Sequence, residues 1–280
     1  MKQARTVPVL MYHHISPSEG MITTSPDNFE RQLAWLSRRG YRSLTSDEFA
    51  GHLHGRAVPA RSILITFDDG YLDNWVYAYP LLKKYGFSAL IFLVTSWVGQ
   101  GSVRRYLGQD ELPQTPAHDE CERLIAQGRS DEVILRWSEI EALRAAGTFE
   151  FHSHTHTHTR WDKSMPASEK NAHMAQELSL SRETLAEHLG SVSEHFCWPQ
   201  GYFDADYIRI AREAGFQYLY TTQAFGQNRA GTDPASIYRF AVRNTSGESL
   251  GRRIRIAVHP WIGPLFNRWK LWRRARRQRS

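Results

Sequence analysis

The sequence predicts an α/β protein built on a parallel sheet or barrel. Short apolar runs such as Ile63–Phe67 and Ala89–Val94 alternate with segments of helical pattern, as they do in strand–helix repeats. These runs are continuously apolar, which suits strands buried on both faces. The composition, 41% hydrophobic and 23% charged over 280 residues, is that of a globular chain with a substantial core.

The expected elements begin with a strand over Val7–Tyr12. A helix follows from Pro26, where Ser25 supplies the cap and proline fits the first turn, and Gly40 ends it. Further helices are expected over Ser46–His54, Asn74–Tyr85 and residues 137–146, 168–189 and 204–214. Further strands are expected at Phe149–Phe151, Phe196–Trp198, Gln217–Thr221 and Ile237–Val242.

Two stretches interrupt this alternation. Residues 97–130 are polar and punctuated by glycine and proline, so we expect an insertion there with a helix near 118–127. Residues 223–236 form a loop rich in Gly, Gln and Asn, and long loops of this kind often carry function. We expect one domain over residues 1–262, followed by a basic aromatic tail over residues 263–280.

The positive charge is concentrated in that tail. Residues 266–280 hold seven Lys and Arg and no acid, whereas the whole chain has a net charge of +6, so the body is close to neutral. A nucleic-acid-binding protein would spread such charge over a folded face, and we expect no nucleic-acid partner. Trp269, Leu271 and Trp272 between the basic residues favour peripheral contact with an anionic membrane, and a solvated tail is the alternative.

The N-terminal sequence has no long apolar region of the kind that signal peptides contain. No stretch approaches the roughly 20 apolar residues that a membrane-spanning helix needs. The sequence therefore predicts a cytoplasmic protein, peripheral at the inner membrane face if the tail binds there. Cys121 and Cys197 are expected to be unpaired thiols.

Two adjacent carboxylates follow a buried strand in Ile65-Thr66-Phe67-Asp68-Asp69-Gly70. Adjacent acids repel each other unless positive charge lies nearby, and a metal ion would supply it. One carboxylate could then bind the metal while the other stays free as a base. An ordinary Asp-Asp-Gly turn is the alternative.

Four histidines lie close together after another predicted strand. They form two pairs with the same spacing, His152 with His156 and His154 with His158, and the pattern alone does not choose between them. Neutral imidazole is a common ligand for zinc and similar metals. One carboxylate and two imidazoles would make a hydrolytic metal centre with open positions, in which a bound water loses its proton near neutral pH.

Two other strand ends carry residues that suit hydrolysis. Phe196–Phe203 includes a Pro-Gln-Gly turn that could aim a backbone N–H at a developing oxyanion. Leu10–Ile15 includes His13 and His14, which are candidate general acids. A plain turn and a structural histidine are the alternatives.

Together these motifs resemble the polysaccharide deacetylases of carbohydrate esterase family 4, the NodB homology domain. The resemblance runs from about Val7 to Val242, and its most specific parts are Thr66–Gly70 and Ser153–His158. It implies a distorted, incomplete (β/α) barrel. The Met-Tyr-His segment near the N-terminus is similar to that of the exopolysaccharide deacetylases, in which the strand order is circularly permuted.

The resemblance implies a role for each motif. It makes Asp68 the catalytic base and Asp69, His154 and His158 the ligands of a divalent metal, by default Zn²⁺, with Co²⁺ or Ni²⁺ also suited. His13 becomes the general acid, with His14 second. The residues expected to form the active-site wall and to help hold the oxyanion are Pro199, Gln200, Gly201 and Tyr202.

This sequence departs from the family pattern at Cys197, which occupies the position of an arginine that orients the base. Arg239 and Arg243, on or just after the last expected strand, are candidates to replace it. The resemblance implies removal of N-acetyl groups from an amino sugar in a glycan. The alternatives are a catalytically impaired sugar-binding or scaffold domain and a deacylase of a non-polymeric amide.

Overall fold

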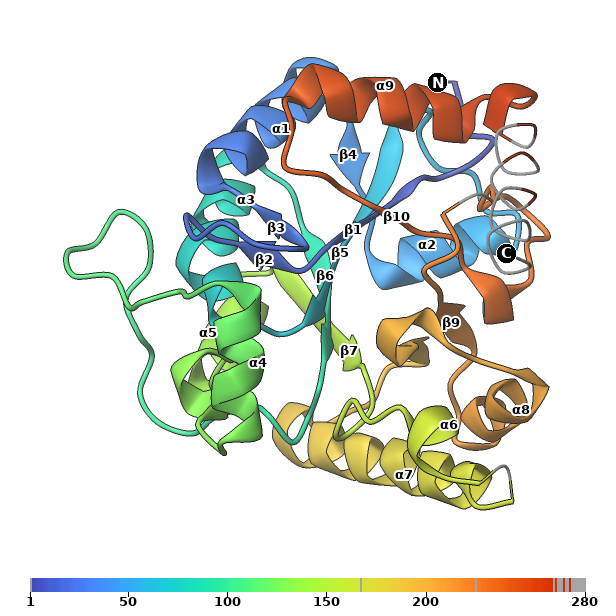
Figure 1. Cartoon of the computed structure of the whole chain (residues 1–280). Helices are drawn as coiled ribbons and strands as arrows, with labels where there is room; N and C mark the ends of the chain where they lie inside the picture. Colours follow the sequence, from blue (N-terminus) through green and yellow to red (C-terminus); the bar gives the residue numbers. More distant parts are fainter. Residues whose placement is uncertain are drawn as a thin grey trace.

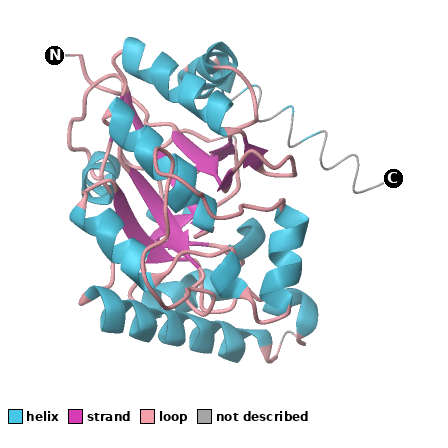
Figure 2. Cartoon of the chain, turned by 90° about the vertical axis from the view of Figure 1, so that its left-hand side faces the viewer, coloured by secondary structure: helices cyan, strands magenta, loops and turns pink. Residues whose placement is uncertain are grey.

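The computed structural model describes residues 2–166, 168–224, 226–263, 265, 269 and 272. Its strands lie in the middle of the molecule with helices around them (Figures 1 and 2). The main strands, in chain order, are β1 (Val9–Tyr12), β4 (Arg42–Ser43), β5 (Ser62–Asp69), β6 (Ala89–Leu93), β7 (Phe149–Ser153), β8 (His195–Cys197), β9 (Tyr218–Tyr220) and β10 (Phe240–Ala241). A short pair, β2 (His14–Ile15) with β3 (Thr23–Thr24), lies apart from them.

The main sheet is parallel throughout and has the order β10-β1-β5-β6-β7-β8-β9, with β4 paired to β5. Its two edges are bridged by one segment, because Ile237 pairs with Tyr220 of β9 and Phe240 pairs with Leu10 of β1. The sheet is therefore a curled, incomplete barrel. The fold class predicted from the sequence is confirmed.

Alternate residues of the strands face opposite sides of this barrel. On β5, Ile63, Ile65 and Phe67 pack outward against the helices, whereas Leu64 packs inside with Phe92 and Tyr220. By the same alternation Thr66 and Asp68 face the interior. The interior is thus apolar at the amino ends of the strands β1, β5 and β6 and polar at the carboxyl end of β5.

The helices, in chain order, are α1 (Pro26–Arg38), α2 (Ser46–Leu53), α3 (Tyr79–Tyr85), α4 (His118–Ala126), α5 (Trp137–Ala145), α6 (Trp161–Ser164), α7 (Lys170–Leu189), α8 (Ala205–Glu213) and α9 (Gly247–Val258). Helix α1 starts as predicted, since the Ser25 hydroxyl accepts from the backbone N–H of Asn28 and Pro26 opens the first turn. Helix α4 confirms the helix expected near 118–127, and the segment before it extends from the body in Figure 1.

Several expected boundaries were wrong. The single helix expected over Asn74–Tyr85 is a π-helical turn, Asn74–Ala78, followed by α3. Pro80 accounts for the break, because it lacks the N–H that would continue the α-helical bonding. The last strand is shorter than expected and begins at Phe240 rather than Ile237.

Helix α9 was not expected from the sequence. It lies beside α1, and Trp35 of α1 fills the space above Gly247 and Gly251, where a Cβ atom would collide with its side chain. The two glycines thus allow the helices to approach closely. The domain boundary at residue 262 stays a prediction, and most of the expected tail lies outside the described residues.

None of the helices in the described part of the chain is long and apolar enough to cross a membrane. Cys121 and Cys197 are both buried, free thiols, as expected.

Candidate active site

The two adjacent carboxylates at the end of β5 reach the same cavity. Asp68 faces the barrel interior by the alternation of the strand, so Asp69 would point outward if the chain stayed extended. Asp69 instead adopts φ 73°, a left-handed conformation that aspartate tolerates better than most residues. This turn, followed by Gly70 with φ 83°, lets both Asp68 and Asp69 line a cavity of about 250 Å³ at the carboxyl end of the barrel.

The histidine motif bends in a similar way. Glu150, His152 and His154 alternate along the interior face of β7 and the residue after it. The chain then turns through Thr155 (φ 70°) and His158 (φ 63°), which brings His158 back over the strand end. Backbone conformations of this kind cost of order 1–3 kcal/mol each and are concentrated at functional sites. They are held here by hydrogen bonds from the His156 and Thr157 N–H groups to Glu177 of α7.

Asp69, His154 and His158 lie close together. The Oδ1 atom of Asp69 is 3.4 Å from His154 Nε2 and 3.6 Å from His158 Nε2. Within the described residues this buried oxygen has no hydrogen-bond partner. Separations of about 3.4 Å are what a tetrahedral ion with ligand distances near 2.0–2.1 Å produces. The three residues therefore fit a metal ion.

The imidazoles are prepared to bind through Nε2. His154 Nδ1 lies 2.8 Å from the Cys197 carbonyl oxygen and donates to it, so Nε2, which faces Asp69, is the nitrogen available to a metal. Cys197 and Asp69 hold the pKa of His154 above its usual value although burial lowers it, so a bound metal would take the place of the Nε2 proton. Burial lowers the pKa of His158 to about 4 against the opposing pull of Asp69, so this ring is neutral at pH 7. Neutral imidazole is the form that ligates metals.

A second group of potential ligands, formed by Asp68, His154 and Cys197, fits a metal less well. Arg239 already contacts two members of that group, Asp68 and Cys197. Its Nη1 and Nη2 atoms donate to Asp68 Oδ1 at 2.6 Å and Oδ2 at 2.8 Å, and Nη2 lies 2.9 Å from Cys197 Sγ. Asp68 is thus neutralised by a guanidinium and remains outside the metal-ligand set.

Arg239 reaches Asp68 because of the barrel closure. It lies between Ile237, which pairs with β9, and Phe240, which pairs with β1, and its side chain is fully buried. The small side chain of Cys197, whose Sγ lies 2.9 Å from Arg239 Nη2, leaves room for the guanidinium. This guanidinium holds the pKa of Asp68 below its usual value, although burial alone would raise it. Arg243, the other candidate, is exposed and does not line the cavity.

The two candidate acids occupy different places. His13 lines the cavity, and its Nε2 is 3.7 Å from Asp68 Oδ2; burial lowers its pKa. His14 is 1% exposed and turns away, with Nδ1 2.6 Å from Asp73 Oδ2. The structure thus brings His13 to the carboxylates and leaves His14 behind the cavity wall.

Of the expected wall residues, Gln200 lines the cavity together with Trp198 and Thr222. Gln200 has φ 51°, and a Cβ atom at Gly201 would collide with Thr222, so this turn requires its glycine. Tyr202 points elsewhere and packs against Arg160. Sequence reasoning missed several lining residues, all outside the recognised motifs: Met21, Ile22, Tyr71, Trp97, His118, Glu122 and Thr222.

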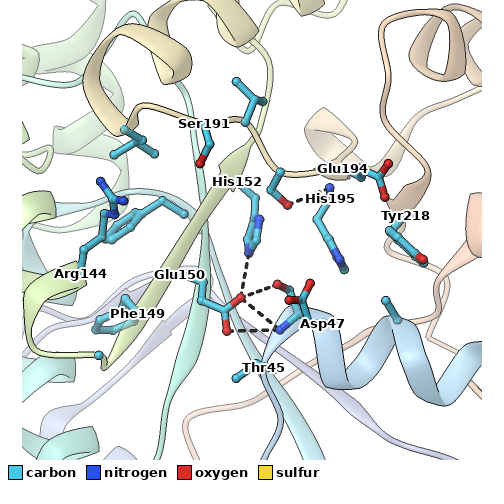
Figure 3. A pocket seen from close by; sticks show the side chains of 17 residues that line it. Thr45, Asp47, Arg144, Phe149, Glu150, His152, Ser191, Glu194, His195 and Tyr218 are labelled. Atoms are coloured by element: carbon cyan, nitrogen blue, oxygen red, sulfur yellow. Dashed lines mark hydrogen bonds and ion pairs between the residues drawn. The ribbon is translucent and has the colours of Figure 1, made fainter. Parts of the chain in front are cut away.

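The remaining two histidines of the cluster lie away from Asp69. The Nδ1 atom of His156 is 2.9 Å from the Thr95 hydroxyl. His152 points toward Glu150 in a separate, wider cavity of about 680 Å³ at the amino ends of β7, β8 and β9 (Figure 3). Of the two histidine pairs with equal spacing, the structure brings His154 and His158 together beside Asp69.

A sequence model described as polysaccharide deacetylase matches residues 55–219 of the chain. The protein belongs to this family. The matched segment contains Asp68, Asp69 and both histidines of the candidate metal site, and it ends before Arg239.

Individual relatives agree with this assignment. Over 208 residues, or 72% of the chain, it is 26% identical to poly-β-1,6-N-acetyl-D-glucosamine N-deacetylase of Staphylococcus aureus, covering 61% of that protein. A polysaccharide deacetylase-like protein of Bacillus subtilis, YxkH, is 38% identical over 113 residues, which are 40% of this chain and 39% of that one. The chain thus spans between about two fifths and three fifths of these relatives.

Solved structures share the fold. IcaB from Ammonifex degensii is 26% identical and superposes with a TM-score of 0.71 over 90% of this chain and 97% of its own. The deacetylase PplD of Streptococcus pyogenes, 21% identical, gives 0.69 over 89% and 97%. The second likeness concerns the fold alone.

Proposed function

We propose that this protein removes N-acetyl groups from amino sugars of a glycan and that it does so with a bound divalent metal. One observation carries the proposal: a three-ligand set and a separate, arginine-held carboxylate line the same small cavity. A hydrolytic metal centre needs these two parts, since one set holds the ion and the other accepts a proton.

Asp69, His154 and His158 would hold the metal. One carboxylate and two imidazoles favour Zn²⁺, and Co²⁺ or Ni²⁺ suit the same ligands. When bound, such an ion polarises a carbonyl group and lowers the pKa of a water molecule. The fit rests on the orphaned Asp69 Oδ1 and on the two imidazole Nε2 atoms that face it.

Asp68 would be the general base. Arg239 keeps it ionised and fixes both of its oxygens, so its geometry is set before the substrate arrives. The proton that Asp68 accepts from the attacking water has a short onward path, because His13 Nε2 lies 3.7 Å from Asp68 Oδ2. His13 would deliver one proton to the departing nitrogen, which balances the proton taken from the water.

The turn at Pro199–Gly201 would stabilise the oxyanion. The N–H groups of Gly201 and Tyr202 bond to the carbonyls of Trp198 and Pro199, which leaves the Gln200 N–H as the donor we assign to the developing charge. Tyr202 would support the turn rather than contact the substrate.

The substrate class rests on the relatives. The name of the Staphylococcus aureus protein states that it acts on poly-β-1,6-N-acetyl-D-glucosamine. We propose the broader substrate class, N-acetylated amino sugars in a glycan, for this chain. A non-polymeric amide is the first alternative. A catalytically impaired sugar-binding domain is the second, and the intact pairing of Asp68 with Arg239 argues against it.

Acetate release tests the proposal. Purified protein is loaded with Zn²⁺ and incubated with β-1,6-linked N-acetylglucosamine oligomers, chitin oligomers and a simple acetamide. We expect acetate from at least one oligomer and stoichiometric metal. Metal-loaded protein that binds oligomers without releasing acetate would establish the sugar-binding alternative, and release from the acetamide alone would establish the deacylase.

We also propose that the C-terminal region contacts an anionic membrane surface. Trp261 and Leu265 expose 75% and 64% of their surface, and the basic residues of 266–280 follow directly. Apolar side chains beside a basic segment favour the boundary of an anionic bilayer. Co-sedimentation with phosphatidylglycerol vesicles, and not with phosphatidylcholine vesicles, is expected; equal recovery in both pellets, or in neither, would contradict it. The predicted cytoplasmic location stays a prediction.

A further inference from the structure

One wall of the active-site cavity comes from the segment between β6 and β7, not from the recognised motifs. His118 and Glu122, one turn apart on α4, both line the cavity that contains the candidate metal ligands. The helix is anchored by Cys121 and Leu124, which pack in one cluster with Tyr71 and Ile134. This wall therefore presents two polar side chains to whatever occupies the cavity.

His118 is the end of a buried hydrogen-bonded chain. Asp73 Oδ2 lies 2.6 Å from His14 Nδ1, and His14 Nε2 lies 3.2 Å from His118 Nδ1. The His14 ring also stacks on Tyr71 at a centroid distance of 3.7 Å. Asp73 and His14 are 3% and 1% exposed, so solvent does not compete for these contacts.

For two neutral rings, this chain of contacts allows only one arrangement of the protons. Asp73 Oδ1 accepts from the Ile15 backbone N–H and from the side-chain amide of Asn74, and Oδ2 is left to accept from His14 Nδ1–H. His14 Nε2 is then an acceptor, so His118 Nδ1 is the donor that faces it, and the Tyr71 hydroxyl oxygen, 3.4 Å from the same nitrogen, can accept from it as well. The remaining nitrogen of His118, Nε2, therefore carries a lone pair.

That lone pair faces another acceptor. His118 Nε2 lies 3.5 Å from Glu122 Oε1, and the Glu122 side chain is 66% exposed at the cavity mouth. Two acceptors at this distance repel each other unless a donor lies between or beside them. Hydroxyl and ammonium groups of sugars are such donors.

We propose that His118 and Glu122 form a sugar-recognition subsite that accepts a hydroxyl or ammonium donor of the bound glycan, and that Asp73 and His14 hold His118 in the accepting tautomer. The proposal rests on the proposed function, because it takes the cavity to be the glycan site. His118 and Glu122 contact substrate, whereas Asp73 and His14 are positioning residues.

Two exposed apolar residues on the same cavity support a sugar ring as the occupant. Met21 and Ile22 are 69% and 38% exposed and line the same cavity. Ile22 has φ 57°, which is unusual for a β-branched residue, and its carbonyl accepts from the His14 N–H. Apolar side chains and two acceptors lining one cavity match a sugar, which has an apolar face and a hydroxylated edge.

Steady-state kinetics of the Zn²⁺-loaded protein test the subsite. The probes are a fully acetylated β-1,6-linked N-acetylglucosamine pentamer and the same pentamer with one free amine. His118→Ala is expected to raise KM at least about tenfold with kcat within about threefold, and His118→Gln to recover part of the loss, since its side-chain oxygen can accept near the Nε2 position. A hydroxyl donor predicts equal effects on both probes, whereas an ammonium donor predicts that Glu122→Gln raises KM for the amine probe alone.

Asp73→Asn tests the positioning chain. The new amide keeps an oxygen that accepts from the Ile15 N–H and turns its NH₂ group toward His14. The proton of each imidazole must then move to the other ring nitrogen, and His118 Nε2–H donates to Glu122. Imidazole ¹⁵N spectra should show Nδ1-protonated His118 in the wild type and Nε2-protonated His118 in the variant, which should also raise KM.

An unchanged KM in His118→Ala for both probes, or a doubly protonated His118 in the resting protein, would overturn this inference while acetate release continued. A wild-type protein that binds metal but neither binds nor deacetylates either pentamer would overturn the proposed function, and this inference with it.

Discussion

The two ends of the barrel contain similar residues and differ in what they can do. His154 and His152 both project inward from β7 or its end, and each has a carboxylate nearby. At the carboxyl end, His154 bonds the Cys197 carbonyl and faces Asp69. At the amino end, neither nitrogen of His152 has a hydrogen-bond partner among the described residues, and Glu150 lies 4.0 Å away while it bonds the N-terminal residue of α2, Ser46 (Figure 3).

The difference shows that histidine content does not make a metal site. Three side chains converge on one point at the carboxyl end because left-handed turns at Asp69 and His158 redirect the chain. No comparable turn follows Glu150, which stays in the regular strand. Among the described residues, ligand triads occur only at the carboxyl end.

Removing a ligand should have the largest effect. Asp69→Asn keeps the size of the side chain and takes away the anionic oxygen that His154 and His158 face. We expect loss of stoichiometric metal, measured by elemental analysis, and a fall in kcat/KM of roughly 10³-fold or more. The matched control at the amino end is Glu150→Gln, which should retain both metal and rate. Equal losses in the two variants would break the distinction between the two ends.

His13 tests whether the carboxyl-end site extends beyond the metal ligands. His13→Gln removes the only proton donor we assign to the leaving nitrogen and keeps a side chain of similar length. A fall in kcat of about 10²–10⁴-fold is expected, with metal content unchanged. Full activity with retained metal would show that another group supplies this proton.

Arg239 should have a smaller effect that depends on pH. Arg239→Lys keeps a positive charge beside Asp68 but loses the two-pronged contact, so kcat should fall by roughly 10–100-fold. Because Arg239 holds the pKa of Asp68 down, the variant should raise it, and the acid side of the pH–rate profile should move to higher pH. Arg243→Lys, an exposed position, serves as the control. An unshifted acid limb would contradict this role.

The sequence was sufficient for the strand–helix order and for the motifs that follow β5 and β7, because these depend on local patterns. It named Arg239 and Arg243 as candidates to orient the base but could not choose between them, since the contact with Asp68 depends on barrel closure by residues far apart in the chain. His118 and Glu177 carry no local signal, because a polar residue on a helix resembles any solvated one. Helix α9 was missed because its two glycines weaken the helical pattern, and the close approach of α1 through Trp35 and Arg31 explains them.

The smallest expected effect belongs to His152. Burial lowers its pKa to about 3, whereas an unfolded histidine titrates near 6.5, so the unfolded chain binds the extra proton between these values. This residue therefore contributes full stability above about pH 6.5 and loses it progressively as the pH falls toward 3. His152→Leu removes two unpartnered nitrogens at similar volume, so we expect a change of about 1 kcal/mol or less in unfolding free energy at pH 7 and a shallower decline in acid. Urea unfolding between pH 7 and pH 5 measures both quantities. A loss of more than about 2 kcal/mol at pH 7 would mean that the imidazole has polar partners in solution, and the contrast between the two ends would then rest on the convergence of ligands alone.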